Sequence, residues 1–379
     1  MRVLLLTCNT GEGHNSAAQA IQEALHAHNV QCDSLDFLRL ISEKAASFVC
    51  GWHTRLYRYA PRAMDAGYSL AEANSRALGH NNALYHYLAQ GAGKLYQHLN
   101  NGGYDAVVCV HVFAAMMMSL LRVKYHRDIA AYFVATDYTC TPPLGETTLD
   151  GYFIPHAGLM EEFEASGLSR EKLIPSGIPV RRAFYERTTE NAKAALGLSA
   201  DQRNVLLMCG SMGCGPIGQI TSRLAEKLPK DTVLSVICGT NEKLRQSLAG
   251  QNRKNVTIYG YTDNVPLLMD SAELYLTKPG GISITEATVK RLPMLLIDAV
   301  GGCEAPNLSY FTKNDWARTE STPSRIVKTC IELLSHPEKL NEASLRLETD
   351  FTGIAAVKIA AHLIEHAYLS SSVKNGMVD

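Results

Sequence analysis

His14 is the first side chain of this sequence with the properties of a catalytic group. It lies between an apolar run and an alanine-rich segment that predicts a helix, and Gly11 and Gly13 precede it. Neutral imidazole is well suited to removing a proton from a hydroxyl group near pH 7. We therefore interpret His14 as the general base for a hydroxyl nucleophile. Positioning of that hydroxyl and a structural role are the alternatives.

Two other polar side chains follow apolar runs in the first half of the chain. Asp137 is the rival base, or the carboxylate that orients the imidazole, while His111 either lines an acceptor pocket or belongs to the core. Ser16 and Gln19 have the spacing of a capping box, which predicts that the helix begins just after His14.

Two glycine-rich loops in the second half predict a phosphate-binding site. Each follows an apolar run and precedes a helical pattern, so backbone N–H groups and a helix N-terminus can approach an anion. The first loop contains Gly210, Ser211, Met212 and Gly213, and the second contains Pro279, Gly280, Gly281, Ile282 and Ser283.

Polar side chains next to these loops are candidates for binding a sugar. Ser283 and Glu286 have capping-box spacing, which predicts a helix beginning near Ser283. The alternative role of Glu286 is to accept hydrogen bonds from a sugar diol. Glu304 and Asn307, on a loop after the next predicted strand, offer groups to further hydroxyls.

The predicted elements place these groups at the ends of strands. Continuous apolar runs alternate with helix-length segments, which is typical of parallel sheets covered on both faces. The predicted strands are Arg2–Thr7, Asp105–Val110, Ile129–Ala135, Tyr152–Ile154, Leu173–Pro175, Asn204–Cys209, Thr232–Cys238, Val256–Tyr259, Glu273–Thr277 and Pro293–Ile297. We predict an α/β chain of two doubly wound domains, with a boundary near 180–200 and a cleft where the domains face each other. Ligands bind beyond the carboxyl ends of such strands.

Composition and short motifs argue against several classes of protein and binding site. A length of 379 residues with 46% apolar side chains suits two domains, and a net charge of −1 argues against a general nucleic-acid binder. The ten cysteines include no C-x-x-C pair, which argues against a structural zinc site. Gly213–Gly218 matches a dinucleotide fingerprint, but the next strand lacks the acid that holds a ribose. No apolar run suits a signal peptide or a membrane span, so we expect a cytosolic protein that at most lies on a membrane surface.

The segment 43–76 interleaves aromatic and basic side chains, among them Trp52, Tyr57 and Arg58. This pattern suits a helix on an anionic membrane, because the rings reach the lipid while the cations meet the head groups. The alternative is an ordinary surface helix with one buried face.

The order and spacing of the motifs resemble glycosyltransferase family 28, and within it the monogalactosyldiacylglycerol synthases and the processive diacylglycerol β-glucosyltransferases. The resemblance spans nearly the whole chain. It rests on Gly-Glu-Gly-His14, Ala135-Thr-Asp-Tyr138, Gly177-Ile-Pro179, Cys209-Gly-Ser-Met-Gly213, Thr277-Lys-Pro-Gly-Gly281 with Glu286-Ala287, and Glu304 to Asn307. It implies a GT-B fold, a UDP-sugar donor in the C-terminal domain and a lipid acceptor at the N-terminal domain. It also implies inversion at the anomeric carbon without a catalytic metal.

The resemblance assigns roles to several residues. Glu286 would bind the uridine ribose, Glu304 and Asn307 would hold the sugar hydroxyls, and Tyr261 and Thr262 would meet the uracil.

Three sequence features bear on the donor. Gly13 carries no side chain that would obstruct the diphosphate or the sugar. The chain contains no Asp-x-Asp motif, so peptide amides would have to meet the charge of the leaving group. Gly302-Cys-Glu304 differs from the Gly-Gln-Glu of relatives.

On the acceptor side, Tyr138–Pro143 lacks the histidine and bulky aromatic that many relatives carry.

Together with the motifs, the resemblance implies an inverting, metal-independent hexosyltransferase at the inner face of the cell membrane. It would transfer glucose or galactose from a UDP-sugar to a lipid hydroxyl, with diacylglycerol as the first candidate. Residues 1–182 would bind the acceptor, 183–350 would bind the UDP-sugar, and 351–379 would form a helix that crosses back to the first domain. The alternatives are an N-acetylglucosaminyltransferase acting on a polyprenyl-linked cell-wall precursor, a UDP-sugar epimerase and a non-catalytic UDP-sugar sensor.

Overall fold

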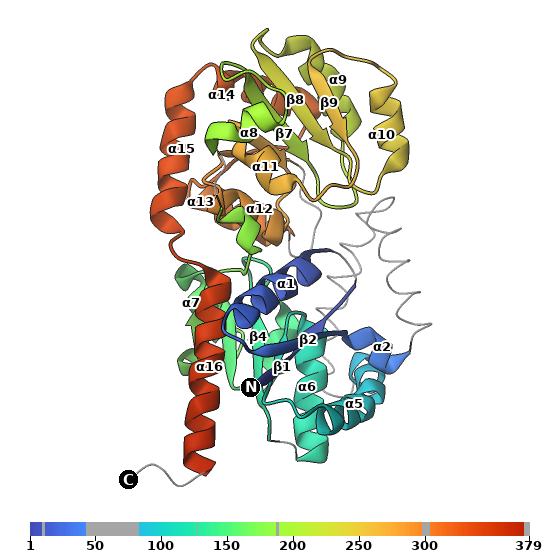
Figure 1. Ribbon diagram of the computed structural model, residues 1–379, viewed down its shortest axis with the longest axis vertical. Helices are drawn as coiled ribbons and strands as arrows, with labels where there is room; N and C mark the ends of the chain where they lie inside the picture. Colours follow the sequence, from blue (N-terminus) through green and yellow to red (C-terminus); the bar gives the residue numbers. More distant parts are fainter. Residues whose placement is uncertain (10–11, 43–82, 127, 187–188, 298–303, 375–379) are drawn as a thin grey trace. The chain divides into compact units, whose positions relative to one another are not determined.

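The computed structural model describes residues 1–9, 12–42, 83–126, 128–186, 189–297 and 304–374 (Figure 1). These residues divide into two units. Unit 1 contains the described residues up to Arg181 together with those from Gly353 onward, and unit 2 contains those between Arg182 and Thr352.

Unit 1 is built on a parallel sheet with the strand order β2-β1-β3-β4-β5-β6. Its main elements are β1 (Arg2–Thr7), α1 (Glu12–Ala27), β2 (Gln31–Asp36), α2 (Phe37–Ile41), α5 (Ala83–Gly102), β3 (Ala106–Cys109), α6 (Val112–Tyr125), β4 (Ala130–Val134), β5 (Gly151–Ile154), α7 (Met160–Ala165), β6 (Leu173–Pro175) and α16 (Ala355–Lys374). Every residue of β3 and β5 is buried, because helices cover both faces of the sheet.

Unit 2 has a second parallel sheet, with the order β12-β11-β10-β7-β8-β9. Its main elements are α8 (Thr189–Ala195), β7 (Arg203–Met208), α9 (Ile217–Lys227), β8 (Thr232–Ile237), α10 (Glu242–Ala249), β9 (Val256–Tyr259), α11 (Val265–Asp270), β10 (Leu274–Thr277), α12 (Gly281–Val289), β11 (Met294–Ile297), α13 (Glu304–Lys313), β12 (Arg318–Glu320), α14 (Pro323–Leu334) and α15 (Pro337–Asp350). Side chains from β7, β8, β10 and β11 form its core with α9 and α14.

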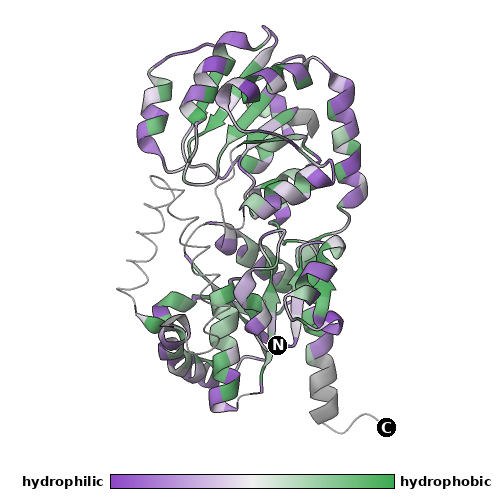
Figure 2. Cartoon of the chain, turned by 180° about the vertical axis from the view of Figure 1, so that it is seen from behind, coloured by the Kyte–Doolittle hydropathy of each residue, from purple (hydrophilic) through white to green (hydrophobic). Residues whose placement is uncertain are grey.

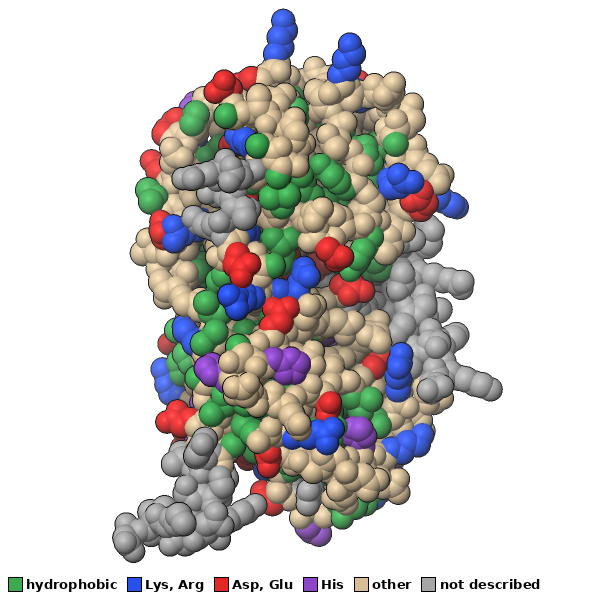
Figure 3. All heavy atoms as spheres, in the orientation of Figure 1, with side chains coloured by type: hydrophobic (Ala, Val, Ile, Leu, Met, Phe, Trp, Pro, Cys, Tyr) green, Lys and Arg blue, Asp and Glu red, His purple; other side chains and the backbone are tan. Residues whose placement is uncertain are grey.

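The prediction of two doubly wound parallel sheets is confirmed, and every strand predicted from the sequence is present. In both units the strands carry the most hydrophobic residues, while the surrounding helices turn hydrophilic residues outward (Figure 2). Acidic and basic side chains are interspersed over the face drawn in Figure 3, in keeping with the near-zero net charge.

The strands β2 and β12 were not predicted. Both are edge strands with polar or charged side chains and exposed positions.

The last helix, α16, belongs to unit 1 although unit 2 precedes it in the sequence. It packs against α1, and the ring of His362 contacts Tyr132 of β4 and Phe153 of β5 edge-on, at centroid distances of 5.6 and 5.3 Å (Figure 1). The final segment therefore completes one face of the first sheet.

A buried ion pair fixes the C-terminal end of α12. The Nζ of Lys290, the C-cap residue of this helix, lies 2.7 Å from Asp270 Oδ2, and the two side chains are 0% and 3% exposed. The same ammonium donates a hydrogen bond to the backbone carbonyl of Glu186 at 2.8 Å. Removing one member of a buried pair leaves the other charge without compensation, which costs far more than losing a surface pair.

We predict that Lys290→Met lowers the free energy of unfolding of unit 2 by about 3–5 kcal/mol, because the buried Asp270 carboxylate loses the ammonium that lies 2.7 Å from it. Urea unfolding followed by intrinsic fluorescence measures this, since Trp316 is buried in unit 2. The matched control is Lys339→Met, whose ion pair with Glu332 is exposed, and which should change stability by about 0.5 kcal/mol or less. Equal effects of the two substitutions would contradict the role given to the buried pair.

Candidate active site

The strand order of each sheet indicates where a ligand is expected to bind. In a doubly wound sheet, ligands bind beyond the carboxyl ends of the two strands between which the strand order reverses. In unit 2 these strands are β7 and β10, and in unit 1 they are β1 and β3. The loops after β7 and β10 are the two glycine-rich loops, and the chain after β1 and β3 carries His14 and His111.

The loop after β7 has a backbone that only glycine adopts readily. Gly210 and Gly213 have φ angles of +70° and +57°. A Cβ at Gly213 would lie 2.0 Å from the backbone oxygen of Cys238, so a side chain there is excluded by the loop after β8. Gly210, Ser211, Met212 and Gly213 are thereby held in a tight turn at the switch point. Burial raises the pKa of the neighbouring Cys209 thiol to about 12, so this cysteine stays uncharged near pH 7.

The loop after β10 ends in a helix with a bare N-terminus. Helix α12 begins at Gly281 with Gly280 as its N-cap, and no side chain caps it. The prediction of a helix start near Ser283 with a capping box to Glu286 was wrong, because the Ser283 hydroxyl instead lies 2.7 Å from the Tyr275 hydroxyl. Gly280 thus has no side chain with which to cap the first-turn N–H groups, and such an uncapped N-terminus is an arrangement that can bind phosphate groups.

A lysine joins the loops of unit 2. Lys278 follows β10, and its Nζ lies 2.6 Å from Oε1 of Glu304, with the two side chains 15% and 11% exposed. Glu304 and Asn307 were predicted on a loop, but they lie in the first turn of α13. Asn307 is fully buried and its Nδ2 donates to the carbonyl of Pro279 at 3.0 Å, so this side chain also holds the glycine-rich loop after β10 in place.

The sequence did not single out Lys278 as a site residue. The signal was available, since this lysine stands inside the motif that precedes Gly280, at the end of a buried strand. Its ion pair joins positions 26 residues apart, and only the fold shows that contact.

The other donor-site candidates lie around this centre. Glu286 is one turn into α12 and 7% exposed, and Ile282 lies between Gly281 and Ser283 in the first turn. Tyr261 and Thr262 follow β9, the edge strand on the far side of β8, and Tyr261 is 58% exposed.

In unit 1, His14 is positioned with a defined tautomer. It lies in the first turn of α1, which begins at Glu12 rather than after His14, and Gln19 bonds Glu23 instead of completing the predicted capping box. The ring Nδ1 lies 2.8 Å from the backbone oxygen of Val110, which can only accept. Nδ1 is therefore the protonated nitrogen. The described hydrogen-bond contacts of His14 involve Nδ1 only, so the unprotonated Nε2 can accept a proton.

The surroundings of His14 keep it neutral. Its pKa is lowered from the ordinary value by burial, which outweighs the negative charge of Asp137 and the hydrogen bond to Val110, both of which raise it. Thr136, which the sequence did not single out, lies between the two groups, with its Oγ1 3.4 Å from His14 Nδ1 and 3.5 Å from Asp137 Oδ2. A neutral ring with an available Nε2 can act as a general base near pH 7. Gly13 precedes it in the same turn.

His111 has a structural role next to His14. It is the N-cap of α6, and its Nδ1 accepts from the backbone N–H of Phe113 at 3.1 Å. Its ring also packs edge-on against His14 at a centroid distance of 4.8 Å. The structure thus brings His14, His111 and Asp137 together at one switch point.

Some predicted features lie outside the described residues. These are Trp52, Tyr57, Arg58 and the rest of the segment 43–76. No described helix has both the length and the apolar character needed to cross a membrane. Nor do the described side chains include a group of three or more His, Cys, Asp or Glu residues placed to hold a metal ion.

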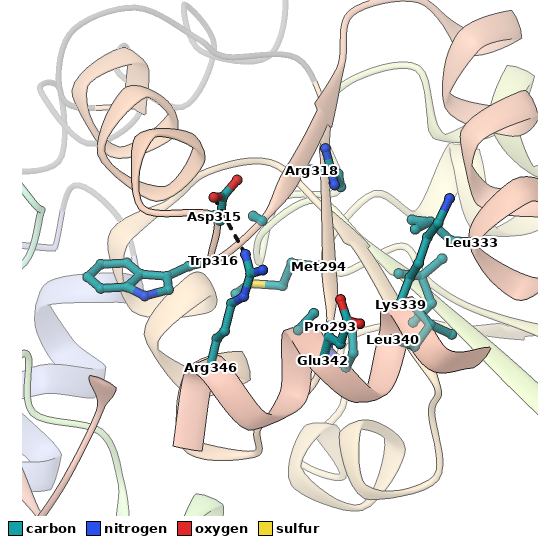
Figure 4. Close-up of a pocket in the computed structure, with 13 residues that line it drawn as sticks. Pro293, Met294, Asp315, Trp316, Arg318, Leu333, Lys339, Leu340, Glu342 and Arg346 are labelled. Carbon is teal, nitrogen blue, oxygen red and sulfur yellow. Dashed lines mark ion pairs between the residues drawn. The ribbon is translucent and has the colours of Figure 1, made fainter. Parts of the chain in front are cut away.

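A pocket of about 180 Å³ lies elsewhere in unit 2. Leu274, Met294 and Arg318, the first residues of β10, β11 and β12, line it with Trp316 and with side chains of α15 (Figure 4). It is therefore at the amino edge of the sheet, opposite to the glycine loops, and parallel sheets bind ligands at the carboxyl edge. We place the active site at the loops rather than in this pocket.

Comparison with known families covers both units. Residues 14–180 match the family model of monogalactosyldiacylglycerol (MGDG) synthase, and residues 204–357 match that of the glycosyltransferase family 28 C-terminal domain. The first match contains His14, His111 and Asp137, and the second contains the glycine loops, Lys278 and Glu304.

Individual relatives agree with these matches. The chain is 26% identical to the processive diacylglycerol beta-glucosyltransferase of Staphylococcus saprophyticus, over 96% of this chain and 92% of the relative. Among solved structures it resembles MurG of Acinetobacter baumannii, with a TM-score of 0.62, 12% identity and coverage of 96% and 99%. It also resembles the UDP-GlcNAc 2-epimerase of Neisseria meningitidis, with a TM-score of 0.62, 14% identity and coverage of 98% and 100%. These likenesses show a GT-B fold, which transferases and epimerases share.

We predict that the His14 imidazole titrates with a pKa below 6.5, because burial disfavours its charged form. Asp137→Asn should lower this pKa further, since it removes the charge that favours the imidazolium. NMR titration of the ring signals in the wild type, with His14→Gln to assign them, measures both values. A wild-type pKa above 6.5, or a rise in the Asp137→Asn variant, would contradict the described electrostatics.

Proposed function

Because residues 14–180 belong to the monogalactosyldiacylglycerol synthase family and residues 204–357 to the glycosyltransferase family 28 C-terminal domains, we propose that this protein is an inverting glycosyltransferase. It transfers glucose or galactose from a UDP-sugar to a hydroxyl group of diacylglycerol. The relative from Staphylococcus saprophyticus, named for this reaction, aligns over nearly the whole chain and supports the proposal.

The proposal rests on one observation: the two matched regions contain different kinds of chemical group. Unit 1 contributes a neutral histidine with an available Nε2, and unit 2 contributes glycine loops and a bare helix N-terminus. The first suits the activation of a hydroxyl acceptor, and the second suits a nucleotide diphosphate.

The proposed reaction is a single displacement. His14 Nε2 takes the proton of the acceptor hydroxyl, and the acceptor oxygen forms a bond to the anomeric carbon of the sugar. The bond from that carbon to the β-phosphate oxygen breaks on the opposite face, and its electron pair leaves with UDP. An α-linked donor therefore gives a β-glycoside. Asp137, which raises the pKa of His14, stabilises the imidazolium that forms.

Donor binding follows the glycine loops. The N–H groups at Gly281, Ile282 and Ser283 face the diphosphate, so the charge of the leaving group is met by peptide amides and no catalytic metal is needed. Glu286 holds the ribose, Glu304 accepts from sugar hydroxyls, and the Tyr261 loop meets the uracil. Diacylglycerol is a membrane lipid, so we propose that the protein works at the cytoplasmic face of an anionic membrane, with segment 43–76 as its contact.

The proposal predicts a lipid-extractable glycoside when the purified protein is incubated in EDTA with diacylglycerol vesicles and radiolabelled UDP-glucose or UDP-galactose. Thin-layer chromatography of the organic phase detects the product, and β-glucosidase or β-galactosidase digestion reports its anomeric form. An absence of lipid product with both donors would refute the proposal. Product from UDP-N-acetylglucosamine alone would favour the cell-wall alternative, and conversion of the donor without acceptor would favour an epimerase.

The matched control for this assay is a pair of histidine variants. In both His14 and His336, Nδ1 lies 2.8 Å from a backbone carbonyl oxygen, but His336 precedes α15, away from the glycine loops. His14→Ala should lower kcat by about 10²–10⁴-fold through loss of the general base, while His336→Ala should keep wild-type activity.

A further inference from the structure

The Lys278–Glu304 ion pair occupies the centre of the phosphate-binding loops. It is short, at 2.6 Å between Nζ and Oε1, and mostly buried, so each charge helps to compensate the other. Lys278 is the residue directly after β10, and Glu304 is the first residue of α13. The pair therefore connects the chain after β10 with the chain that follows β11.

The Lys278 side chain lies against glycines of both glycine-rich loops. A Cβ added at Gly210 would lie 2.8 Å from Lys278 Cε and 3.5 Å from its Nζ, and one added at Gly280 would lie 3.9 Å from Cε. The same Gly280 position is 3.8 Å from Glu304 Oε1. The lysine thus extends over the switch point between β7 and β10, next to the helix N-terminus at Gly281.

We propose that Lys278 exchanges partners during the reaction, from Glu304 in the free enzyme to the diphosphate of the bound UDP-sugar. This inference rests on the proposed function. When the ammonium moves to the diphosphate, hydroxyl groups of the donor sugar replace it as hydrogen-bond donors to Glu304. Both buried charges then remain compensated in the donor complex.

The exchange places a positive charge where negative charge develops. The diphosphate of a UDP-sugar carries two negative charges. A third develops as the bond from the anomeric carbon to the β-phosphate oxygen breaks and its electron pair stays on that oxygen. A lysine already in contact stabilises that change more than it stabilises the bound substrate, which is the requirement for catalysis.

The exchange also provides for product release. Once the sugar has left with the acceptor, Glu304 loses its hydroxyl donors and becomes a buried carboxylate that needs a partner. It then draws Lys278 back from the diphosphate, which weakens the binding of UDP. Glu304 is therefore a competitor of UDP for the same ammonium.

A merely structural ion pair would behave differently. If Lys278 and Glu304 only held the loops in place, removing either side chain would disturb the loops and weaken UDP binding. Partner exchange instead predicts opposite effects on UDP affinity from the two members of one pair.

Isothermal titration of the full-length protein with UDP and with uridine separates these cases. Lys278→Met should lower UDP affinity by about tenfold or more, because a charge-assisted contact with the diphosphate is lost, and should leave uridine affinity unchanged. Glu304→Gln should raise UDP affinity severalfold, since the competing carboxylate is gone, again without an effect on uridine. Lys278→Arg should restore most of the UDP affinity, which shows that a loss in Lys278→Met is not misfolding. Lys313→Met, an exposed lysine at the end of α13, is the matched control and should bind UDP as the wild type does.

The outcomes are distinct. Unchanged UDP affinity in Lys278→Met, or weaker UDP binding in Glu304→Gln, would overturn the exchange while leaving the proposed function intact. If the wild-type protein does not bind UDP at all, the proposed function itself fails and the exchange fails with it.

Discussion

In the proposed mechanism, the negative charge of a diphosphate is the constraint on which the unit 2 site depends. A buried anion must be met by hydrogen-bond donors or cations, because water no longer solvates it. The carboxyl edge of the second sheet supplies both kinds of group. Backbone N–H groups at the start of α12 are left without a side-chain cap, and Lys278 reaches the same place from the end of β10. Glycines at 210 and 280 leave room for the lysine, and Asn307 fixes the loop through the Pro279 carbonyl.

The same topology presents a different chemical group in unit 1. There the switch point lies between β1 and β3, and the group it presents is a ring whose protonation is set by its neighbours. The carbonyl of Val110 fixes the tautomer of His14, burial lowers its pKa, and Asp137 limits how far the pKa falls. One architectural rule, that loops at the carboxyl edge carry function, thus accounts for both the anion site and the proton acceptor of the proposed mechanism.

The sequence predicted the fold class because fully buried parallel strands are continuous apolar runs, as in Ala106–Cys109 and Leu274–Thr277. It missed β2 and β12 because these two edge strands contain mostly polar or charged residues, so their own hydrophobicity does not identify them. It also placed the starts of α1 and α12 too late, since serines with capping-box spacing suggested later boundaries; α1 begins at Glu12, and α12 begins at Gly281 with Gly280 as its N-cap. Candidate residues were recognised one by one, but the Lys278–Glu304 and Thr136–His14 contacts join distant segments, and no local pattern encodes them.

The central claim is that groups of the protein itself, at the start of α12, hold the diphosphate. A crystal structure of the protein with UDP in EDTA tests this most directly. The account predicts diphosphate oxygens within hydrogen-bond distance of the backbone N–H groups of residues 281–283. Uridine diphosphate bound elsewhere, such as in the pocket beside Trp316, or binding only when a divalent ion is restored, would contradict it.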